Sequence, residues 1–277
     1  MCLFSSFTFD GKSSKDMGVV LVAIDPGKKV SFGLNRDILK GEKTKYRPRV
    51  NHFGTTYSED LEFDISIVKA TAKTAAKQNV EFTSDDVRKI NGWLTSPQFP
   101  RLFTIQTCEE YFKEPIEFFV IFDEISTEYN GNLCMLTYHV TCDSPFGYTP
   151  EITHTLSPTV TAPAQLVVTN NSDEYEEYVY PRFEIAPNVT GDITIENVTD
   201  GHSMTFKAYK DNDVIWDCQK MQFKDFTGEL LSFEDIGVDD VGSVYWFRLC
   251  YGENIIKISG GADVKLIYRE PRKVGAF

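Results

Sequence analysis

Short segments in which apolar and polar residues alternate dominate this chain. Leu61, Phe63, Ile65 and Ile67 alternate with mostly polar neighbours, the period of two that is typical of a strand with one buried face. Comparable patterns predict further strands in the first half, at residues 7–10, 19–24, 102–105, 118–122 and 133–142. The first half is therefore predicted to be mainly β.

A different period marks residues 84–94, where Val87, Ile90 and Leu94 follow helical spacing with Trp93 beside them. Thr83 or Ser84 can cap this segment, and two aspartates fall in its first turn, where the helix dipole favours anions. Two prolines after residue 96 prevent continuation. The pattern predicts one short amphipathic helix, whereas residues 69–79, with little apolar periodicity, are predicted to be a loop or hairpin tip.

The second half begins after a run rich in proline and threonine that follows Cys142, which is typical of an exposed connector. Strand patterns then recur about every ten residues. They lie at residues 166–169, 178–185, 192–198, 203–209, 214–217, 244–250, 255–259 and 264–268. This series of short strands predicts an antiparallel sandwich or jelly roll.

Composition and charge argue against several classes of protein for this chain, such as nucleic-acid-binding and membrane-spanning proteins. The net charge is −13, and residues 151–277 contribute 21 acidic against 11 basic residues, so tight binding to nucleic acid is not expected. Uninterrupted apolar runs such as residues 118–122 are far shorter than a membrane span, and residues 1–16 do not have the pattern of a signal peptide. No pair among the six cysteines has the CxxC spacing, so we expect mostly reduced core cysteines.

The search for catalytic and metal motifs finds little. GxSxG, HExxH, Walker A and GxGxxG patterns are all missing, and the four histidines do not have ligand spacing. A chance Cys–His pair remains open from sequence. The aspartates that could bind a hard cation do not fit an EF-hand loop and are predicted to be acidic surface turns; they are Asp211, Asp213, Asp235, Asp239 and Asp240. We therefore expect no enzyme activity, no cofactor and no metal.

Two surfaces could bind a partner. Residues 28–49 contain eight basic and two acidic residues and are predicted to form a strand–turn–strand excursion. Its charges are either solvated, docked against an acidic neighbour or bound to phosphate. Trp216, Tyr245 and Trp246 are predicted to fill a sandwich core; contact with another subunit and stacking against a sugar are the alternatives.

The order of several segments resembles a known family. FTFDGKSSKDMGVVL opens the chain, RKINGWLTSPQFPRLFTI and CDSPFGYTP follow, and the second half carries YVYPRFEI, GDITIENVTDG, DVIWDCQKM and GENIIKISGGADV. Together they resemble the distal tail protein (Dit) family of long-tailed phages that infect Gram-positive bacteria. The resemblance covers nearly the whole chain.

The resemblance implies a fold and a role. The fold is mainly β, with an N-terminal β-sandwich domain (1–148) that carries one α-helix and a protruding hairpin, and a C-terminal galectin-like β-sandwich (149–277). Such proteins form a hexameric ring at the distal end of the virion tail and leave a central channel through which DNA passes only in transit. The implied partners are other copies of the chain, the tail tube protein, the tail-tip or tail-associated protein, the tape measure protein and a receptor-binding protein, with no membrane partner. Synthesis in the cytoplasm of the bacterial host follows from the same resemblance.

For the ring, contacts between subunits are expected from the first strand, the basic excursion and the region of the helix. The residues chosen for these contacts are Phe7, Phe9, Lys40, Lys43, Lys45, Arg47 and Trp93. The alternative function is a carbohydrate-binding module for host cell-wall glycans. None of the four histidines begins the His-x-Asn-x-Arg motif of galectins, and fold similarity does not carry sugar binding across that gap.

Overall fold

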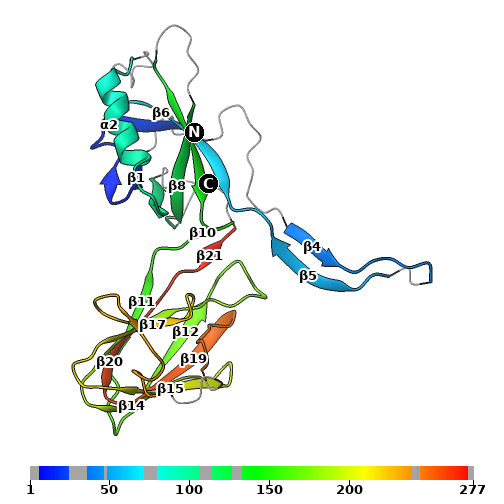
Figure 1. Ribbon diagram of the computed structural model, residues 1–277, viewed down its shortest axis with the longest axis vertical. Coiled ribbons are helices and arrows are strands. Elements are labelled where there is room, and N and C mark those ends of the chain that lie inside the picture. The colour runs from blue at the N-terminus through cyan, green and yellow to red at the C-terminus, as the bar shows by residue number, and fades with distance from the viewer. Residues whose placement is uncertain are drawn as a thin grey trace. The chain divides into compact units, whose positions relative to one another are not determined.

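The computed structural model describes residues 6–24, 36–46, 49–71, 80–106, 114–126, 133–238, 242 and 244–273. The chain divides into two compact units (Figure 1). The first runs to Tyr148 and resumes at Arg272, and the second spans Thr149–Pro271. Among the described residues there is one helix, and the remaining regular elements are strands, as the alternating patterns predict.

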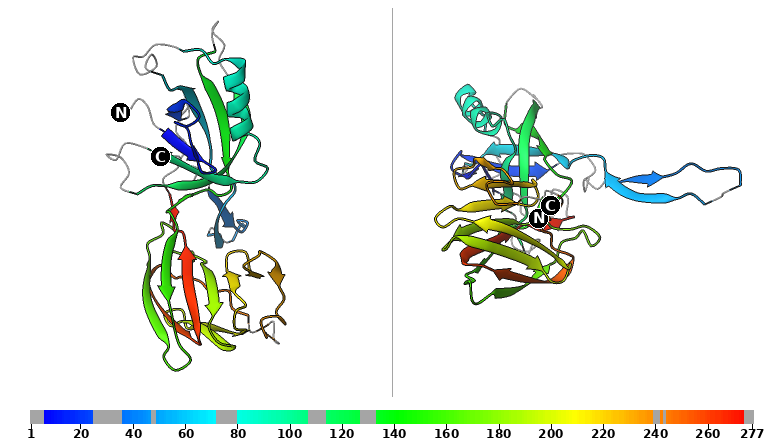
Figure 2. Two further views of the ribbon diagram at one scale, coloured as in Figure 1. Left: turned by 90° about the vertical axis from the view of Figure 1, so that its left-hand side faces the viewer. Right: turned by 60° about the horizontal axis from the view of Figure 1, so that its bottom comes forward.

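The first unit is built on one large sheet with the strand order β2-β1-β7-β8-β9-β6-β3; β10 pairs with β8, and β21 pairs with β10. The sheet curls, because β1 and β3 lie near opposite ends of this order and still contact each other (Figure 2). The strands of this sheet are β1 (Ser6–Phe9), β2 (Lys12–Ser13), β3 (Val19–Ile24), β6 (Glu62–Lys69), β7 (Arg101–Gln106), β8 (Glu117–Ser126), β9 (Leu136–Cys142), β10 (Gly147–Tyr148) and β21 (Pro271–Arg272).

The Asp10–Gly11 turn shows how local sequence sets this sheet. Phe9 pairs with Lys12, so only Asp10 and Gly11 connect β1 to β2. Both residues have positive φ, 49° and 75°, which a two-residue hairpin turn of type I′ requires and which Asp-Gly tolerates well. The turn leaves Phe7 and Phe9 on the inner face of β1, where both are fully buried.

Helix α2 (Ser84–Leu94) covers the core of the first unit with Ile90, Trp93 and Leu94. Thr83 caps it: the Thr83 hydroxyl accepts from the Asp86 amide at 3.2 Å, and the Thr83 amide donates to the Asp86 carboxylate at 2.8 Å. This reciprocal capping box satisfies two amides that would otherwise lack partners at the helix start. The predicted helix is confirmed, and of the two candidate caps, Thr83 and Ser84, the structure uses Thr83.

Replacing Thr83 by alanine tests the cap. The variant loses the acceptor for the Asp86 amide, so we expect the free energy of unfolding to fall by about 1 kcal/mol. Urea denaturation followed by circular dichroism measures the change. Arg88→Ala, on the exposed side of the same helix, is the matched control and should leave the unfolding midpoint within error; an equal loss in both variants would contradict the capping role.

The second unit is a sandwich of two sheets. One sheet has the order β11-β20-β13-β16-β17-β18 and the other has the order β12-β19-β14-β15. The strands are β11 (Ile152–Leu156), β12 (Ala164–Asn170), β13 (Arg182–Pro187), β14 (Gly191–Asn197), β15 (His202–Ala208), β16 (Val214–Asp217), β17 (Gln222–Asp225), β18 (Leu230–Leu231), β19 (Gly252–Ser259) and β20 (Ala262–Tyr268). Alternate residues of both sheets enter one core centred on Trp216, Phe183 and Phe206.

One predicted strand differs from the structure. Residues 244–250 were expected to form a regular strand, but only the isolated bridge between Val179 and Leu249 forms there. Phe247 and Leu249 are still fully buried. The apolar alternation therefore predicts correctly which side chains are buried. It does not predict the backbone pairing, because apart from this bridge the segment forms no strand–strand hydrogen bonds of a sheet with other described residues.

Candidate functional site

A separate hairpin is the most exposed regular element of the first unit. Strands β4 (Arg36–Lys40) and β5 (His52–Tyr57) pair antiparallel and form their own two-stranded sheet, drawn apart from the curled sheet in Figure 1. Every described residue of β4 and all but Tyr57 of β5 are exposed. The protruding hairpin predicted from the sequence is confirmed, but its second strand comes from residues after the basic run.

The root of the hairpin is anchored by aromatic packing within the first unit. Tyr57 packs edge-on against Phe146, with the ring centroids 4.7 Å apart. The Arg36 guanidinium lies 5.8 Å from the centre of the Tyr57 ring and donates to the Thr55 hydroxyl at 2.5 Å. These contacts fix the base of β4 and β5, while the remaining hairpin side chains stay available at the surface.

The rest of the hairpin combines apolar and basic side chains. Four large apolar residues are more than two-fifths exposed: Ile38, Leu39, Tyr46 and Phe53. Lys40, Lys43 and Lys45 are also exposed, and Arg47 lies outside the described residues. A two-stranded hairpin is marginal on its own in water, and exposed aromatic side chains are typical of protein interfaces. The hairpin therefore has the composition of a docking element.

The other three predicted contact residues lie in the core of the first unit. Phe7 and Phe9 are fully buried and Trp93 is 8% exposed. Trp93 stacks on Phe7 with the rings 5.5 Å apart, and its indole N–H donates to the Phe9 carbonyl at 3.3 Å. These side chains join β1 to helix α2 within one chain and leave almost no surface for a second copy.

An acidic patch lies on the polar face of the curled sheet. We define it as Glu62 and Asp64 of β6 and Asp123 of β8, gathered around His139 of β9. Strand pairing places Asp64 opposite His139, and His139 Nδ1 lies 2.7 Å from Asp64 Oδ1. Partial burial opposes a charged imidazole, but the hydrogen bond to Asp64 and the nearby carboxylates outweigh burial and raise the pKa of His139. The patch nonetheless stays negative near neutral pH, with three carboxylates against one imidazole.

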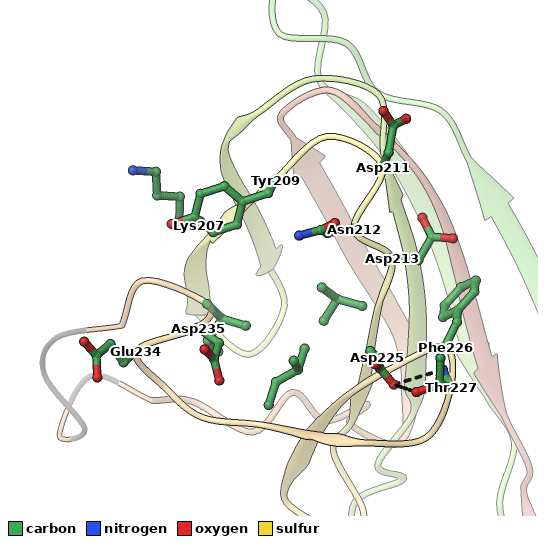
Figure 3. Close-up of a pocket in the computed structure, with 13 residues that line it drawn as sticks. Lys207, Tyr209, Asp211, Asn212, Asp213, Asp225, Phe226, Thr227, Glu234 and Asp235 are labelled. Atoms are coloured by element: carbon green, nitrogen blue, oxygen red, sulfur yellow. Dashed lines mark hydrogen bonds between the residues drawn. The ribbon is translucent and has the colours of Figure 1, made fainter.

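A recess of about 740 Å³ opens in the second unit between the end of β15 and the turns around β16 to β18 (Figure 3). The Asn212 amide points into the recess in the close-up, and the Tyr209 ring lies beside Lys207 at its rim, with the Lys207 ammonium 5.6 Å from the ring centre. The Asp225 carboxylate accepts from the Thr227 and Glu229 amides, both at 2.9 Å. Among the aspartates predicted to form acidic turns, Asp235 also lines the recess, and its carboxylate accepts from the Ser232 amide at 2.8 Å in such a turn.

In the part of the chain that the structure describes, the Cys250 thiol and His202 both adjoin the Asp200 carboxylate, but burial and that carboxylate raise the pKa of Cys250. No group of three or more His, Cys, Asp or Glu residues there could hold a metal ion. Burial raises the pKa of the Cys142 and Cys218 thiols, the opposite of an activated nucleophile. Asp239 and Asp240 lie outside the described residues, so the cation alternative for them is not tested.

The predicted aromatic cluster divides between two environments. Trp216 is fully buried and Trp246 packs against the same core, as expected for sandwich aromatics. Tyr245 also borders that core, but its hydroxyl donates to the Asp200 carboxylate, whose side chain is largely buried. In the described ranges, no helix is long and apolar enough to cross a membrane.

Comparison with known proteins covers almost the entire chain. A family model described as the phage tail protein N-terminal domain matches residues 3–144, and one described as the phage tail C-terminal domain matches residues 146–268. No curated protein sequence matches the chain.

Solved structures agree with the family models on the fold. The Dit protein of phage SPP1, described as a paradigm of the hub adsorption apparatus in phages infecting Gram-positive bacteria, matches with a TM-score of 0.62 at 11% identity, over 97% of this chain and 99% of that one. A chain of the phage P2 baseplate in its activated conformation with calcium matches with a TM-score of 0.53 at 10% identity, over 99% of both chains. The predicted mainly β, Dit-like architecture is thereby confirmed.

Proposed function

The chain belongs to the family of phage tail proteins whose two domain models match it, and we propose that it is the distal tail protein of its particle. In this role it joins the tail tube to the tail tip or baseplate. The observation that carries the proposal is the match along the whole length: two tail-domain models in succession, and a shared fold with a hub protein over 97% of the chain. The two units then correspond to a ring-forming domain and a peripheral domain.

The proposed assembly is a closed ring of copies, with six as the expected number. Closed rings require head-to-tail interfaces, in which two different surfaces of each copy meet. The exposed hairpin supplies one surface, with Lys40, Lys43 and Lys45 and the apolar Ile38 and Phe53. Contact with a neighbour would cover apolar side chains that an isolated copy leaves in water.

We propose that the acidic patch of the next copy supplies the second surface. Its carboxylates on Glu62, Asp64 and Asp123 are opposite in sign to the hairpin lysines. Charge complementarity of this kind mainly sets the register and the association rate, and closely apposed pairs also add affinity. The proposed contact would also change the environment of His139, because a hairpin lysine near Asp64 would compete with the His139 imidazole for that carboxylate.

The ring would leave a central channel for the DNA. A net charge of −13 per copy favours passage, because an attractive wall would hold the phosphate backbone. The proposed partners are the tail tube protein, the tail-tip or tail-associated protein, the tape measure protein and a receptor-binding protein. The protein would be made in the host cytoplasm and reside in the virion tail, without enzymatic activity.

Imaging tests the ring directly. Negative-stain electron microscopy of the purified chain at near-physiological salt is expected to show a ring with six lobes and an open centre. Mass photometry of the same sample should give about six times the 31.5 kDa chain mass. A monodisperse monomer at concentrations up to those of tail assembly would overturn the ring, and hydrolysis of any cell-wall polymer would overturn the purely structural role.

A further inference from the structure

The second unit carries a rigid array of planar side chains at its surface. We define the array as Tyr178, Arg248, Tyr245 and His202, gathered around Asp200. The Arg248 guanidinium lies 3.9 Å from the centre of the Tyr178 ring and 6.0 Å from that of Tyr245. His202 stacks on Tyr245 with 4.6 Å between centroids and 15° between planes. Four planar groups from three separate segments thus adjoin one another.

Asp200 fixes the orientation of the array. Its carboxylate accepts from Arg248 Nε at 3.0 Å and from Arg248 Nη2 at 3.2 Å, and it also accepts from the Tyr245 hydroxyl. His202 Nδ1 lies 3.3 Å from the same carboxylate. Burial opposes ionisation of Asp200, but the hydrogen bonds from Arg248 and Tyr245 outweigh it and lower the pKa of Asp200. The carboxylate is therefore ionised throughout the neutral range.

The backbone around Asp200 is equally constrained. The Asn197 side chain accepts from the Thr199 amide at 3.1 Å, and the Gly201 amide donates to the Asn197 carbonyl at 2.8 Å. Gly201 has a φ of 75°, which suits glycine in this turn. Val179 and Leu249 exchange two backbone hydrogen bonds, which hold Tyr178 beside Arg248. A site whose side chains are already ordered loses little conformational entropy when it binds.

The array keeps polar atoms and ring faces available. The hydrogen bonds of this group to Asp200 use Arg248 Nε and Nη2 and His202 Nδ1, which leaves Arg248 Nη1 and His202 Nε2 as the remaining ring and guanidinium nitrogens. Tyr178 is 39% exposed and the His202 side chain 52% exposed. Tyr175, close to Tyr178 in sequence, and Tyr251, close to Arg248, pack edge-on at 4.7 Å and are also exposed.

The charges around the array limit the classes of ligand that it could bind. Asp200 neutralises Arg248, and the exposed Glu176 and Glu177 precede Tyr178, so the surroundings repel phosphate and carboxylate groups. Exposed tyrosine rings pack against apolar ring faces, and the open donors and acceptors suit hydroxyl groups. These properties together match a neutral sugar, which offers a C–H face and hydroxyls at its edge.

We infer that the array around Asp200 is a saccharide-binding site for uncharged sugars, a second function beside the proposed structural one. Tyr178 supplies the stacking face, Arg248 Nη1 and His202 Nε2 supply hydrogen bonds to hydroxyls, and Asp200 positions them. No bond is made or broken in the sugar. Ring assembly does not require this site, so loss of sugar binding leaves the proposed tail function intact.

Saturation-transfer NMR and calorimetry with the full chain test the site. The probes are oligosaccharides of N-acetylglucosamine, glucose and galactose, with polyglycerol phosphate as the anionic comparison. We expect transfer to at least one neutral oligosaccharide, and a loss of affinity of about tenfold or more in Tyr178→Ala. His202→Ala, a second exposed position, is expected to weaken the same complex.

Tyr209→Ala is the matched control, because Tyr209 is also 39% exposed but lines the recess in Figure 3. Its affinity should equal that of the wild type, and circular dichroism should show all variants folded. The inference is overturned if no neutral probe binds, if only polyglycerol phosphate binds, or if Tyr209→Ala loses binding while Tyr178→Ala retains it.

Discussion

Replacing Lys40, Lys43 and Lys45 together by glutamate is expected to keep the chain monomeric and to prevent the proposed ring. The three lysines are exposed on the hairpin, and reversal would bring like charges together at each proposed contact with Glu62, Asp64 and Asp123. Like charges juxtaposed at an interface cost on the order of several kcal/mol. Association at each interface should therefore weaken by about 100-fold or more, as measured by mass photometry across a concentration series.

A charge swap identifies the surface that receives the hairpin. Glu62→Lys with Asp123→Lys should also prevent assembly when present alone, and a chain that carries both sets of changes should recover rings. Asp64 is left unchanged because it positions His139. Reversal of Lys210, Lys220 and Lys257, three exposed lysines of the second unit, is the control and should leave assembly unchanged. If the hairpin variant forms rings like the wild type, the hairpin is not the contact; if only the rescue fails, the receiving surface is wrong.

Elements governed by local sequence were predicted well. Helix α2 begins and ends where the Thr83 cap and the prolines after Ser96 place its limits. Strand β6 follows the alternation of Phe63, Ile65 and Ile67, all of which are buried. In these cases the hydrogen-bond partners or the buried face are specified within a few residues of the chain.

The residues predicted to form contacts between subunits show what such patterns do not determine. Alternation in β1 indicates that Phe7 and Phe9 share a buried face, but it does not tell whether the same chain or a neighbouring copy covers that face. The structure places Trp93 of the same chain over them. For the hairpin, the basic run predicted the position of β4. Strand β5 has few charged residues, so the sequence pattern does not indicate that it pairs with β4.

The acidic patch and the Asp200 array depend even more on register. His139 meets Asp64 across 75 residues of sequence, and Arg248 meets Asp200 across 48. In the sequence alone, each of these four residues has the pattern of an ordinary polar residue in a strand or turn. The polar residues of β6 meet those of the strand that pairs with it. That this strand is β9 does not follow from local strand propensity.

Trp216→Ala is expected to destabilise the second unit by about 3–5 kcal/mol. Trp216 is fully buried and packs against Phe183 and Phe223, with ring centroids 5.1 and 5.7 Å away, so the truncation opens a large cavity. A loss of this size is a substantial part of the roughly 5–15 kcal/mol that stabilises a typical domain. Hydrogen exchange measured by mass spectrometry should show faster exchange in β13 and β16.

The first unit should keep its protection in the same variant, because the core around Trp216 and the core around Phe103 share no residue. Trp216→Phe is the matched control. The indole N–H of Trp216 has no hydrogen-bond partner within the described residues, so phenylalanine loses volume but no hydrogen bond and should cost well under half as much. Equal loss of protection in β6 and β13 after Trp216→Ala would mean that the two units unfold as one cooperative body.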